Sequence, residues 1–495
     1  MTFSVPTLFH FRLHKSKPKV GSACLDDTHR TMLGLALAGE AASHPGLSGL
    51  YPLADGHDAF AARVMLADAA ERSIDVQYYI WRDDTSGRLL LHHLRQASER
   101  GVRVRLLLDD NNTKGLEGVL TCLHAPPAME VRLFNPLWYR HLRVIDYLFD
   151  FRRVNRRMHN KSFTVDNQVT VVGGRNVGNE YFGAGEGVMF ADLDMLAVGP
   201  VVNDVSRDFD RYWNSASAFP LDYVLPKVPS CEVNPEAPSD PLTQVYLKAL
   251  AQSDLVQKLE RGTLPLQWAK TFLVSDDPAK VLGDVEPSRT MMGQLREVLD
   301  AAQSQLTLVS PYFVPTVTGA HALAKWVSQG VAVSVLTNAL SATDVMPVHA
   351  GYAKYRKQLL KAGVRLFELK RHATLNASGR RRHHGYSGAS LHAKTFALDG
   401  SQIFVGSFNM DPRSARLNTE MGLVMDCPTL AQQLLQGLTQ NSGTHTYEVT
   451  LHHDRLRWTT EENGQTVVYD REPLTSWWRR AAVRILSWLP FEWLL

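Results

Sequence analysis

The sequence predicts an α/β protein that consists of two tandem copies of one domain. The pattern H-x-K-x-x-x-x-D occurs at residues 159–166 and again at residues 392–399. The offset between the copies is constant, since 392 − 159, 394 − 161 and 399 − 166 all equal 233. In both halves, apolar runs typical of buried strands alternate with segments of helical periodicity, which favours an α/β fold. A motif that recurs in register within such a pattern indicates a duplicated domain.

The first copy begins with a helical pattern of apolar residues from Asp58 onward. Residues 73–80 then predict a buried strand. A helix is predicted over residues 87–100, because Gly101 ends its periodicity, and the next strand is predicted over residues 102–108.

The second copy repeats this order. Its elements are a helix over residues 292–302, a strand over 306–313, a helix that ends at residue 329 and a strand over 331–337. The run Val-Arg-Leu-Phe at residues 131–134 recurs at residues 364–367, again 233 positions later.

We divide the chain into five parts, because composition and periodicity change between them. Residues 221–285 are Pro-rich and predict an irregular connector that packs on both domains. In the N-terminal extension, one short helix is expected near residues 31–42. The parts are an N-terminal extension (1–50), a first domain (51–220), the connector (221–285), a second domain (286–445) and a C-terminal segment of strands and one amphipathic helix (446–495).

Composition excludes several classes of protein. With 44% hydrophobic and 21% charged residues over 495 positions, the chain is globular and has an ample core. A net charge of +3 is too small to indicate a nucleic-acid-binding protein. No run of about 18 uncharged apolar residues occurs, so no spanning helix is expected. The cysteines lie far apart, without metal-like spacing, which favours reduced thiols; they are Cys24, Cys122, Cys231 and Cys427. We expect no metal and no cofactor.

The repeated motif carries the chemistry. On an extended chain, His159 and Lys161 share one face, and His392 and Lys394 do the same in the second copy. One such copy alone is better explained by a core histidine near a surface lysine, but two copies in register favour a shared site. A phosphodiester needs a nucleophile on one side of phosphorus, a proton donor on the other and cations around its oxygens. Two histidines and two lysines supply all of these groups.

The motifs continue into Gly-Gly-Arg-Asn at residues 173–176 and Gly-Ser-Phe-Asn at residues 406–409. This combined pattern resembles the phospholipase D superfamily. The resemblance implies two domains related by a pseudo-two-fold axis, with the active site at their interface. One histidine then attacks phosphorus to give a phosphohistidine, and the other serves as acid and base. The residues alone leave open which histidine attacks; the resemblance implies His159, with His392 as acid and base.

Each imidazole needs an acceptor for its remote nitrogen. The candidates are Asp192 and Glu420, which follow the two motifs at family-like spacing, and Asp194 is a near rival of Asp192. The alternative for each is an ordinary surface carboxylate. The remaining motif residues complete the candidate set. We expect Lys161 and Lys394 to bind phosphate oxygens, Asn176, Ser407 and Asn409 to bind substrate, and Asp166 and Asp399 to take a structural role within the catalytic motif. Gly174 stands where the second copy has Ser407.

Longer stretches at residues 75–84, 173–182, 348–352 and 489–495 are similar to bacterial cardiolipin synthases of the C type. This resemblance implies transfer of a phosphatidyl group to phosphatidylglycerol, with phosphatidylethanolamine as donor. It also implies a monomer attached peripherally to the bacterial inner membrane, with a possible accessory protein. Three alternatives stay open, namely a hydrolytic phospholipase D, a nuclease and a catalytically silent membrane scaffold.

Residues 475–489 predict an amphipathic helix. One arc carries Trp477, Trp478, Ala481, Ile485, Trp488 and Leu489, whereas Arg479, Arg480 and Arg484 lie outside it, with Val483 as an apolar exception. Tryptophan-rich and arginine-rich faces are typical of a helix at a bilayer interface. The alternative is a helix that packs on the protein's own core.

Overall fold

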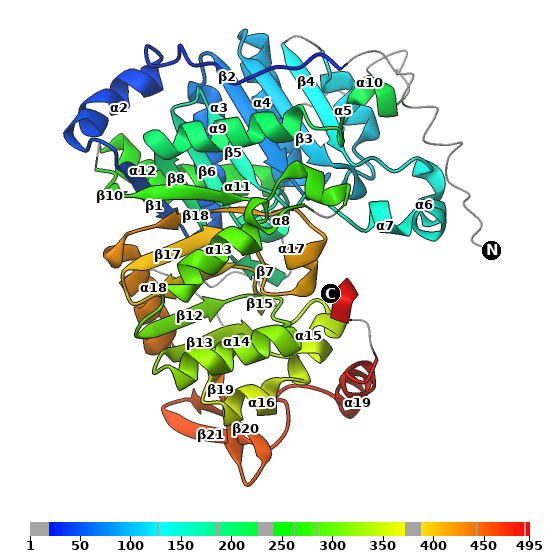
Figure 1. Ribbon diagram of the computed structural model, residues 1–495. Coiled ribbons are helices and arrows are strands. Elements are labelled where there is room, and N and C mark those ends of the chain that lie inside the picture. The colour runs from blue at the N-terminus through cyan, green and yellow to red at the C-terminus, as the bar shows by residue number, and fades with distance from the viewer. Residues whose placement is uncertain are drawn as a thin grey trace.

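The computed structural model describes residues 19–125, 128–184, 188–225, 241–261, 263–283, 285–371, 388–441, 443–489 and 492–495, so Cys231 lies outside the described residues. Two domains stack on each other, and each has a mixed β-sheet with helices packed on it (Figure 1). The predicted fold class is confirmed.

The first sheet has nine strands. Three parallel strands lie at its centre, β2 (Ser73–Tyr78), β3 (Arg103–Asp109) and β4 (Met129–Phe134). They are connected by α4 (Thr85–Glu99) and α5 (Glu117–Leu123), as expected for parallel strands, which need crossover connections. The antiparallel strands β5 (Ser162–Val165), β6 (Val169–Gly173), β8 (Asp194–Val198) and β1 (Ser48–Leu53) continue the sheet on one side, and β9 (Ala218–Pro220) ends it on the other.

The second sheet has ten strands and repeats this topology. The order of its inner strands is β18 (Met421–Met425), β17 (Gln402–Gly406), β16 (Thr395–Leu398), β12 (Gln305–Val309), β13 (Ala332–Asn338) and β14 (Arg365–Leu369). These six strands match β8-β6-β5-β2-β3-β4 of the first sheet one for one. The helices α13 (Met291–Asp300) and α14 (Thr316–Ser328) correspond to α3 (Gly56–Ala69) and α4. The duplication inferred from the motif is therefore a duplication of the whole domain.

The two domains share an apolar core. Side chains of β6 and β8 in the first domain pack against side chains of β17 and β18 in the second, and α9 (Pro200–Trp213) contributes Val201 and Val205. This cluster is buried on both sides, including Val172, Met195, Val405 and Leu423. Burial of an apolar surface of this kind fixes the orientation of the two domains and hence of the groups at their interface.

The predicted boundaries need three corrections. The connector is not irregular where it is described, because it contains α11 (Pro241–Ala251), α12 (Asp254–Glu260), β10 (Gln267–Ala269) and β11 (Thr271–Ser275). Strand β10 joins the first sheet and β11 the second, so the domain boundary lies at Lys270. Both are short edge strands, whose pairing comes from a neighbouring strand and leaves little periodicity in the sequence.

The two ends of the chain also differ from the prediction. Strand β1 starts at Ser48, so the first sheet begins within the expected extension, after the predicted helix, which is α2 (Met32–Ser43). Strands β19 (Thr446–His452), β20 (Arg455–Glu462) and β21 (Gln465–Tyr469) extend the second sheet, and β20 was not predicted. Among the described residues, no helix is both long enough and apolar enough to cross a bilayer.

Candidate active site

Two short parallel pairings join the domains at the motifs. Strand β7 (Val188–Ala191) of the first domain pairs with β15 (Gly388–Leu391) of the second, with Ala191 opposite Leu391. The next residues along these strands are Asp192 and His392. At the second place, a single parallel bridge joins Met158 of the first domain to Thr419 of the second, and the next residues are His159 and Glu420. Each pairing therefore brings a histidine of one domain beside a carboxylate of the other.

Hydrogen bonds complete this exchange. Nδ1 of His159 lies 2.8 Å from Oε2 of Glu420, and Nδ1 of His392 lies 2.5 Å from Oδ2 of Asp192. The backbone N–H of each histidine is fixed as well, because His159 donates to the carbonyl of Thr419 and His392 to that of Ala191, both at 2.8 Å. A carboxylate beside Nδ1 orients each ring and turns Nε2 away from that carboxylate. Nζ of Lys394 lies 3.0 Å from Nδ1 and 3.4 Å from Nε2 of His392.

Regular strand pairing begins only after the reactive residues. We expected His159 and Lys161 on a strand, but β5 starts at Ser162 and β16 at Thr395. The short segments before these strands pair with the other domain instead. This explains how both histidines reach the domain interface rather than the interior of their own sheet.

The two motif lysines are buried and carry no ion pair. Nζ of Lys161 donates to the carbonyl of His159 at 2.6 Å, and Nζ of Lys394 donates to the carbonyl of His392 at 2.5 Å. Neither ammonium lies within ion-pair distance of a carboxylate among the described residues. Burial lowers the pKa of Lys161 to about 7 and also lowers the pKa of Lys394. The negative charge of a phosphate beside the two ammonium groups would oppose both shifts, because it favours the charged form of each lysine.

The two histidine–carboxylate pairs differ electrostatically. Burial, followed by the charges of Lys161 and Lys394, holds the pKa of His159 well below its ordinary value, and burial raises the pKa of Glu420 to about 7. Burial would also raise the pKa of Asp192, but the charges of His392 and Lys394 outweigh it and hold that pKa below its ordinary value. The pKa of His392 is lowered by burial and then by Lys394, while Asp192 acts in the opposite direction. Asp192 therefore keeps its charge beside His392, whereas the first pair favours a neutral imidazole.

Asp194 is not part of this site. Its carboxylate is buried and pairs with Arg63 at 2.7 Å and with Arg175 at 3.5 Å. The strand registers explain why Asp192 is the counterpart of Glu420. Gly173 lies opposite Asp194 in the first sheet, and its counterpart Gly406 lies opposite Gly422 in the second. Asp194 and Gly422 are therefore equivalent, and so are the residues two positions before them, Asp192 and Glu420.

The difference between Gly174 and Ser407 follows from the two carboxylates. A Cβ atom at Gly174 would lie 2.2 Å from Oδ1 of Asp192, so only glycine fits there. At the equivalent place in the second domain, the Ser407 hydroxyl donates to Oε2 of Glu420 at 2.5 Å. The shorter aspartate must lie against the backbone to reach its histidine, whereas the longer glutamate leaves room for a side chain. In this structure, Ser407 thus supports Glu420.

The two motif asparagines differ in their contacts. Asn176 accepts from the backbone N–H of Ile80 at 3.2 Å and donates to the Tyr181 hydroxyl at 2.9 Å. Oδ1 of Asn409 is buried and has no hydrogen-bond partner among the described residues. Asn176 therefore orients a neighbouring ring, while Oδ1 of Asn409 keeps a free capacity to accept a hydrogen bond.

Asp166 and Asp399 lie at the far end of the motif strands. Asp166 accepts from the backbone N–H groups of Glu71, Arg72 and Ser73 at 2.7–3.0 Å, just before β2. Asp399 accepts from Gln303, Ser304 and Gln305 in the same way before β12. Neither aspartate belongs to the histidine–lysine cluster, so the motif's third residue joins strands rather than contacting the reacting groups.

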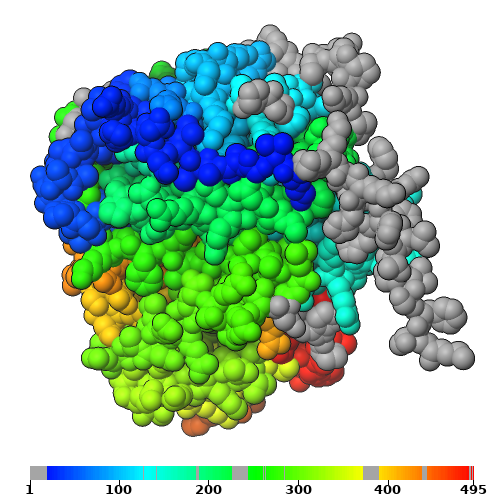
Figure 2. All heavy atoms as spheres, turned by 45° about the horizontal axis from the view of Figure 1, so that its top comes forward, coloured from blue at the N-terminus to red at the C-terminus, as the bar shows by residue number. Residues whose placement is uncertain are grey.

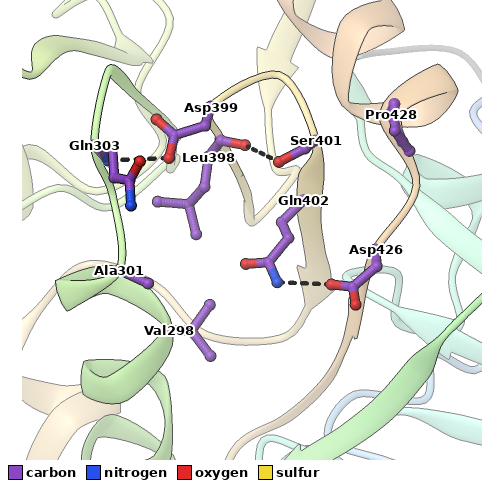
Figure 3. Close-up of a pocket in the computed structure, with 9 residues that line it drawn as sticks. All are labelled: Val298, Ala301, Gln303, Leu398, Asp399, Ser401, Gln402, Asp426 and Pro428. Carbon is purple, nitrogen blue, oxygen red and sulfur yellow. Dashed lines mark hydrogen bonds between the residues drawn. The ribbon is translucent and has the colours of Figure 1, made fainter.

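A surface hollow of about 480 Å³ lies beside Asp399 (Figure 3). It is lined by Val298, Ala301, Gln303, Leu398, Asp399, Ser401, Gln402, Asp426 and Pro428. No motif histidine or lysine lines it, because His392 and Lys394 precede β16, whereas Asp399 follows it. The hollow is therefore separate from the candidate site.

Aromatic rings confine both imidazoles, and the sequence did not indicate them. The Tyr79 ring meets His159 edge-on at a centroid distance of 4.9 Å. Tyr181 and Phe190 contact the His392 ring at 5.1 and 4.9 Å. Tyr79 lies one residue beyond β2, and its place at the carboxyl end of a predicted strand was the only available signal.

Comparisons with known proteins identify the family and the fold of the chain. A family model described as "Cardiolipin synthase, PLD-like domain" matches residues 64–213 and 295–441. Cardiolipin synthase C of Escherichia coli is 50% identical over 463 residues, which cover 91% of this chain and 97% of that protein. An uncharacterized protein of Helicobacter pylori strain 26695 is 30% identical and covers 95% of this chain and 94% of its own length. The crystal structure of phosphatidylserine synthase from Haemophilus influenzae has the same fold, with a TM-score of 0.55, 16% identity and coverage of 93% and 100%.

Proposed function

The chain belongs to the cardiolipin synthase family of phospholipase D-like proteins, and we propose that it transfers a phosphatidyl group from phosphatidylethanolamine to phosphatidylglycerol, giving cardiolipin. Its membership identifies it as a phospholipid phosphatidyltransferase. The observation that carries the mechanism is the exchange of carboxylates between the domains, which places two imidazoles at one interface, each beside a lysine whose ammonium group contacts no carboxylate among the described residues.

In the first step, Nε2 of neutral His159 attacks phosphorus of the donor. The N–P bond forms, the P–O bond to ethanolamine breaks, and protonated His392 gives its proton to the departing oxygen. Lys161 and Lys394 balance the charge on the non-bridging oxygens. The products of this step are a phosphatidyl-histidine and ethanolamine.

In the second step, neutral His392 accepts the proton of the terminal glycerol hydroxyl of phosphatidylglycerol. The hydroxyl oxygen attacks phosphorus, the N–P bond breaks, and cardiolipin leaves. Because one histidine acts as acid and then as base, the enzyme returns to its starting protonation state.

The difference between the two pairs supports His159 as nucleophile. A nucleophilic imidazole must be neutral, and the low pKa of His159, caused first by burial, favours that form. A general acid must hold a proton. Burial and Lys394 lower the pKa of His392 as well, but the ionised Asp192 carboxylate opposes this shift and so favours the protonated form. Each imidazole thus has the neighbour that suits its proposed role.

We further propose that helix α19 (Trp477–Leu486) attaches the enzyme to a membrane surface, peripherally at the bacterial inner membrane. The helix packs on Leu340 and Ala350 through Val483, the apolar residue outside the predicted arc. The arc itself faces outward, since Trp477 is 76% exposed, Trp478 56% and Trp488 74%. Exposed tryptophans beside arginines are typical of a helix at the headgroup boundary.

The test is a product analysis. Purified protein is incubated with mixed vesicles of phosphatidylethanolamine and phosphatidylglycerol, and lipids are identified by mass spectrometry. Cardiolipin with free ethanolamine is expected. Phosphatidic acid as the sole lipid product identifies a hydrolase and contradicts the proposal. The assay is repeated after addition of an extract from cells that lack the gene for this enzyme, because the extract supplies any accessory protein.

A further inference from the structure

We propose that a second element, the helical prominence formed by residues 139–151, inserts into the same bilayer as α19, so that the enzyme contacts lipid through both of its domains. The inference rests on the proposed function, because it takes the substrate to be a membrane lipid. The prominence consists of η2 (Arg140–Leu142), α6 (Val144–Phe149) and the start of α7 (Phe151–Val154).

The polarity of this prominence is inverted. Its large apolar side chains face outward, with Leu142 61%, Val144 61%, Leu148 72% and Phe149 83% exposed. A surface helix of a globular protein normally turns its apolar face to the core. A cluster of exposed apolar side chains of this size marks an interaction surface.

The polar side chains of the prominence hold it to the first domain. Asp146 is buried and accepts from the backbone N–H groups of Trp138 and Tyr139 at 3.1 and 2.8 Å. The Tyr147 hydroxyl donates to Oδ1 of Asn111 at 2.9 Å, and Arg140 forms ion pairs with Asp110 and Glu117. These bonds fix the prominence in an orientation that keeps its apolar side chains exposed. The exposure is therefore built into the fold.

The prominence lies next to the candidate site. Tyr147 and Arg140 bond to Asn111 and Asp110. The preceding residue, Asp109, accepts at 2.9 Å from the backbone N–H of Met158, which directly precedes His159. The chain that leaves α7 reaches His159 four residues after Asn155.

The chain just after the prominence is joined, through Arg413, to the C-terminal segment that follows α19. Arg413 donates to Oδ1 and to the carbonyl of Asn155 at 2.9 and 2.8 Å, and to the carbonyl of Leu494 at 3.2 Å. Figure 1 and Figure 2 agree that α6 and the C-terminal segment lie at the same edge of the molecule. One bilayer surface could therefore contact both elements at once.

A lipid bilayer is the occupant that fits these observations. The surface is apolar at its tip, and exposed Arg152 beside it forms no ion pair among the described residues, which suits anionic headgroups. A diacyl substrate must pass from the bilayer to the histidines without exposing its acyl chains to water. Two insertion points, one on each domain, would hold the domain interface that carries the histidines against the membrane.

The test measures how the full-length protein partitions onto sedimented vesicles of phosphatidylglycerol and phosphatidylethanolamine. The variant Leu148→Gln with Phe149→Gln keeps helix propensity and removes the apolar tip. We expect its partition coefficient to fall by about tenfold or more, because two side chains no longer insert. The matched control, Val317→Gln with Val468→Gln, replaces exposed valines on α14 and β21 and should bind like the unmodified protein. Phe149→Trp should retain binding.

Turnover of a soluble short-chain substrate shows that the variants are folded, and it should be unchanged in all of them. Partition is measured without turnover, so the result does not depend on whether cardiolipin is the product. Normal vesicle binding by the double glutamine variant overturns the inference and assigns the prominence to a protein contact. An equal loss in the valine control overturns it as well, because binding would then follow general surface hydrophobicity.

Discussion

Because each carboxylate contacts the histidine of the other domain, Asp192→Asn and Glu420→Gln should impair different catalytic roles. Asp192 contacts His392, the proposed acid, and Glu420 contacts His159, the proposed nucleophile. With phosphatidylethanolamine as donor, each substitution should lower kcat by about 10²–10⁴-fold, the usual contribution of a positioned acid or base. Overall rates alone therefore do not separate the two roles.

A donor with a p-nitrophenol head group separates them, because this leaving group needs no proton. With it, formation of the phosphoenzyme by Asp192→Asn should recover to within about tenfold of the unmodified protein, since the nucleophile is intact. Glu420→Gln should remain slow, because its nucleophile has lost the group that orients it. Rapid quenching measures the acid-labile phosphohistidine, and Asp300→Asn, an exposed surface carboxylate, is the control.

The pH dependence gives an independent reading. The first step requires protonated His392, and the charge of Asp192 raises the pKa of that imidazole. Removing the charge lowers this pKa, so the alkaline limb of the kcat profile should move to lower pH in Asp192→Asn. Recovery by Glu420→Gln rather than Asp192→Asn with the activated donor would refute the assignment of the two histidines. Equal behaviour of both variants would refute the idea that each carboxylate serves one histidine.

Three further predictions follow from the contacts. Gly174→Ala should abolish most activity, because its Cβ would lie 2.2 Å from Asp192. The double variant Gly174→Ser with Asp192→Glu copies the second half-site and should restore part of the activity. No recovery in the double variant would contradict the steric explanation. Burial raises the folded pKa of Glu420 from 4.5 to about 7, so the stability that its protonated form contributes is full below pH 4.5 and is lost as pH rises through 7. The free energy of unfolding, measured by urea denaturation and compared with that of Glu420→Gln, should therefore fall by roughly 3 kcal/mol between these pH values. A difference between the two proteins that does not change with pH would contradict the burial of this carboxyl group. Trp477→Ser with Trp488→Ser should weaken binding to anionic vesicles about tenfold or more while sparing turnover of a short-chain substrate, and unchanged sedimentation would leave α19 as a packing helix only.

Much of the fold was predictable from local pattern. Helices and central strands were found within a few residues of their observed ends because burial imposes periods of 3.6 and 2 residues on the chain. The constant offset of 233 residues predicted the duplication, which the strand order confirms. The edge strands β10 and β11 were missed, and so was β20 near the end of the second sheet, because the pairing of these strands depends on neighbours rather than on their own composition.

The candidate site shows the same division. The sequence by itself determined the candidate residues, because two registered copies of a histidine and a lysine can supply a nucleophile, an acid and two cations. Tertiary structure decided which groups meet, since Glu420 lies 261 residues from His159 and Asp192 lies 200 residues from His392. No local pattern encodes contacts across such separations. They arise because a shared apolar core fixes the two domains and two short parallel pairings then set each histidine beside the carboxylate of the other domain.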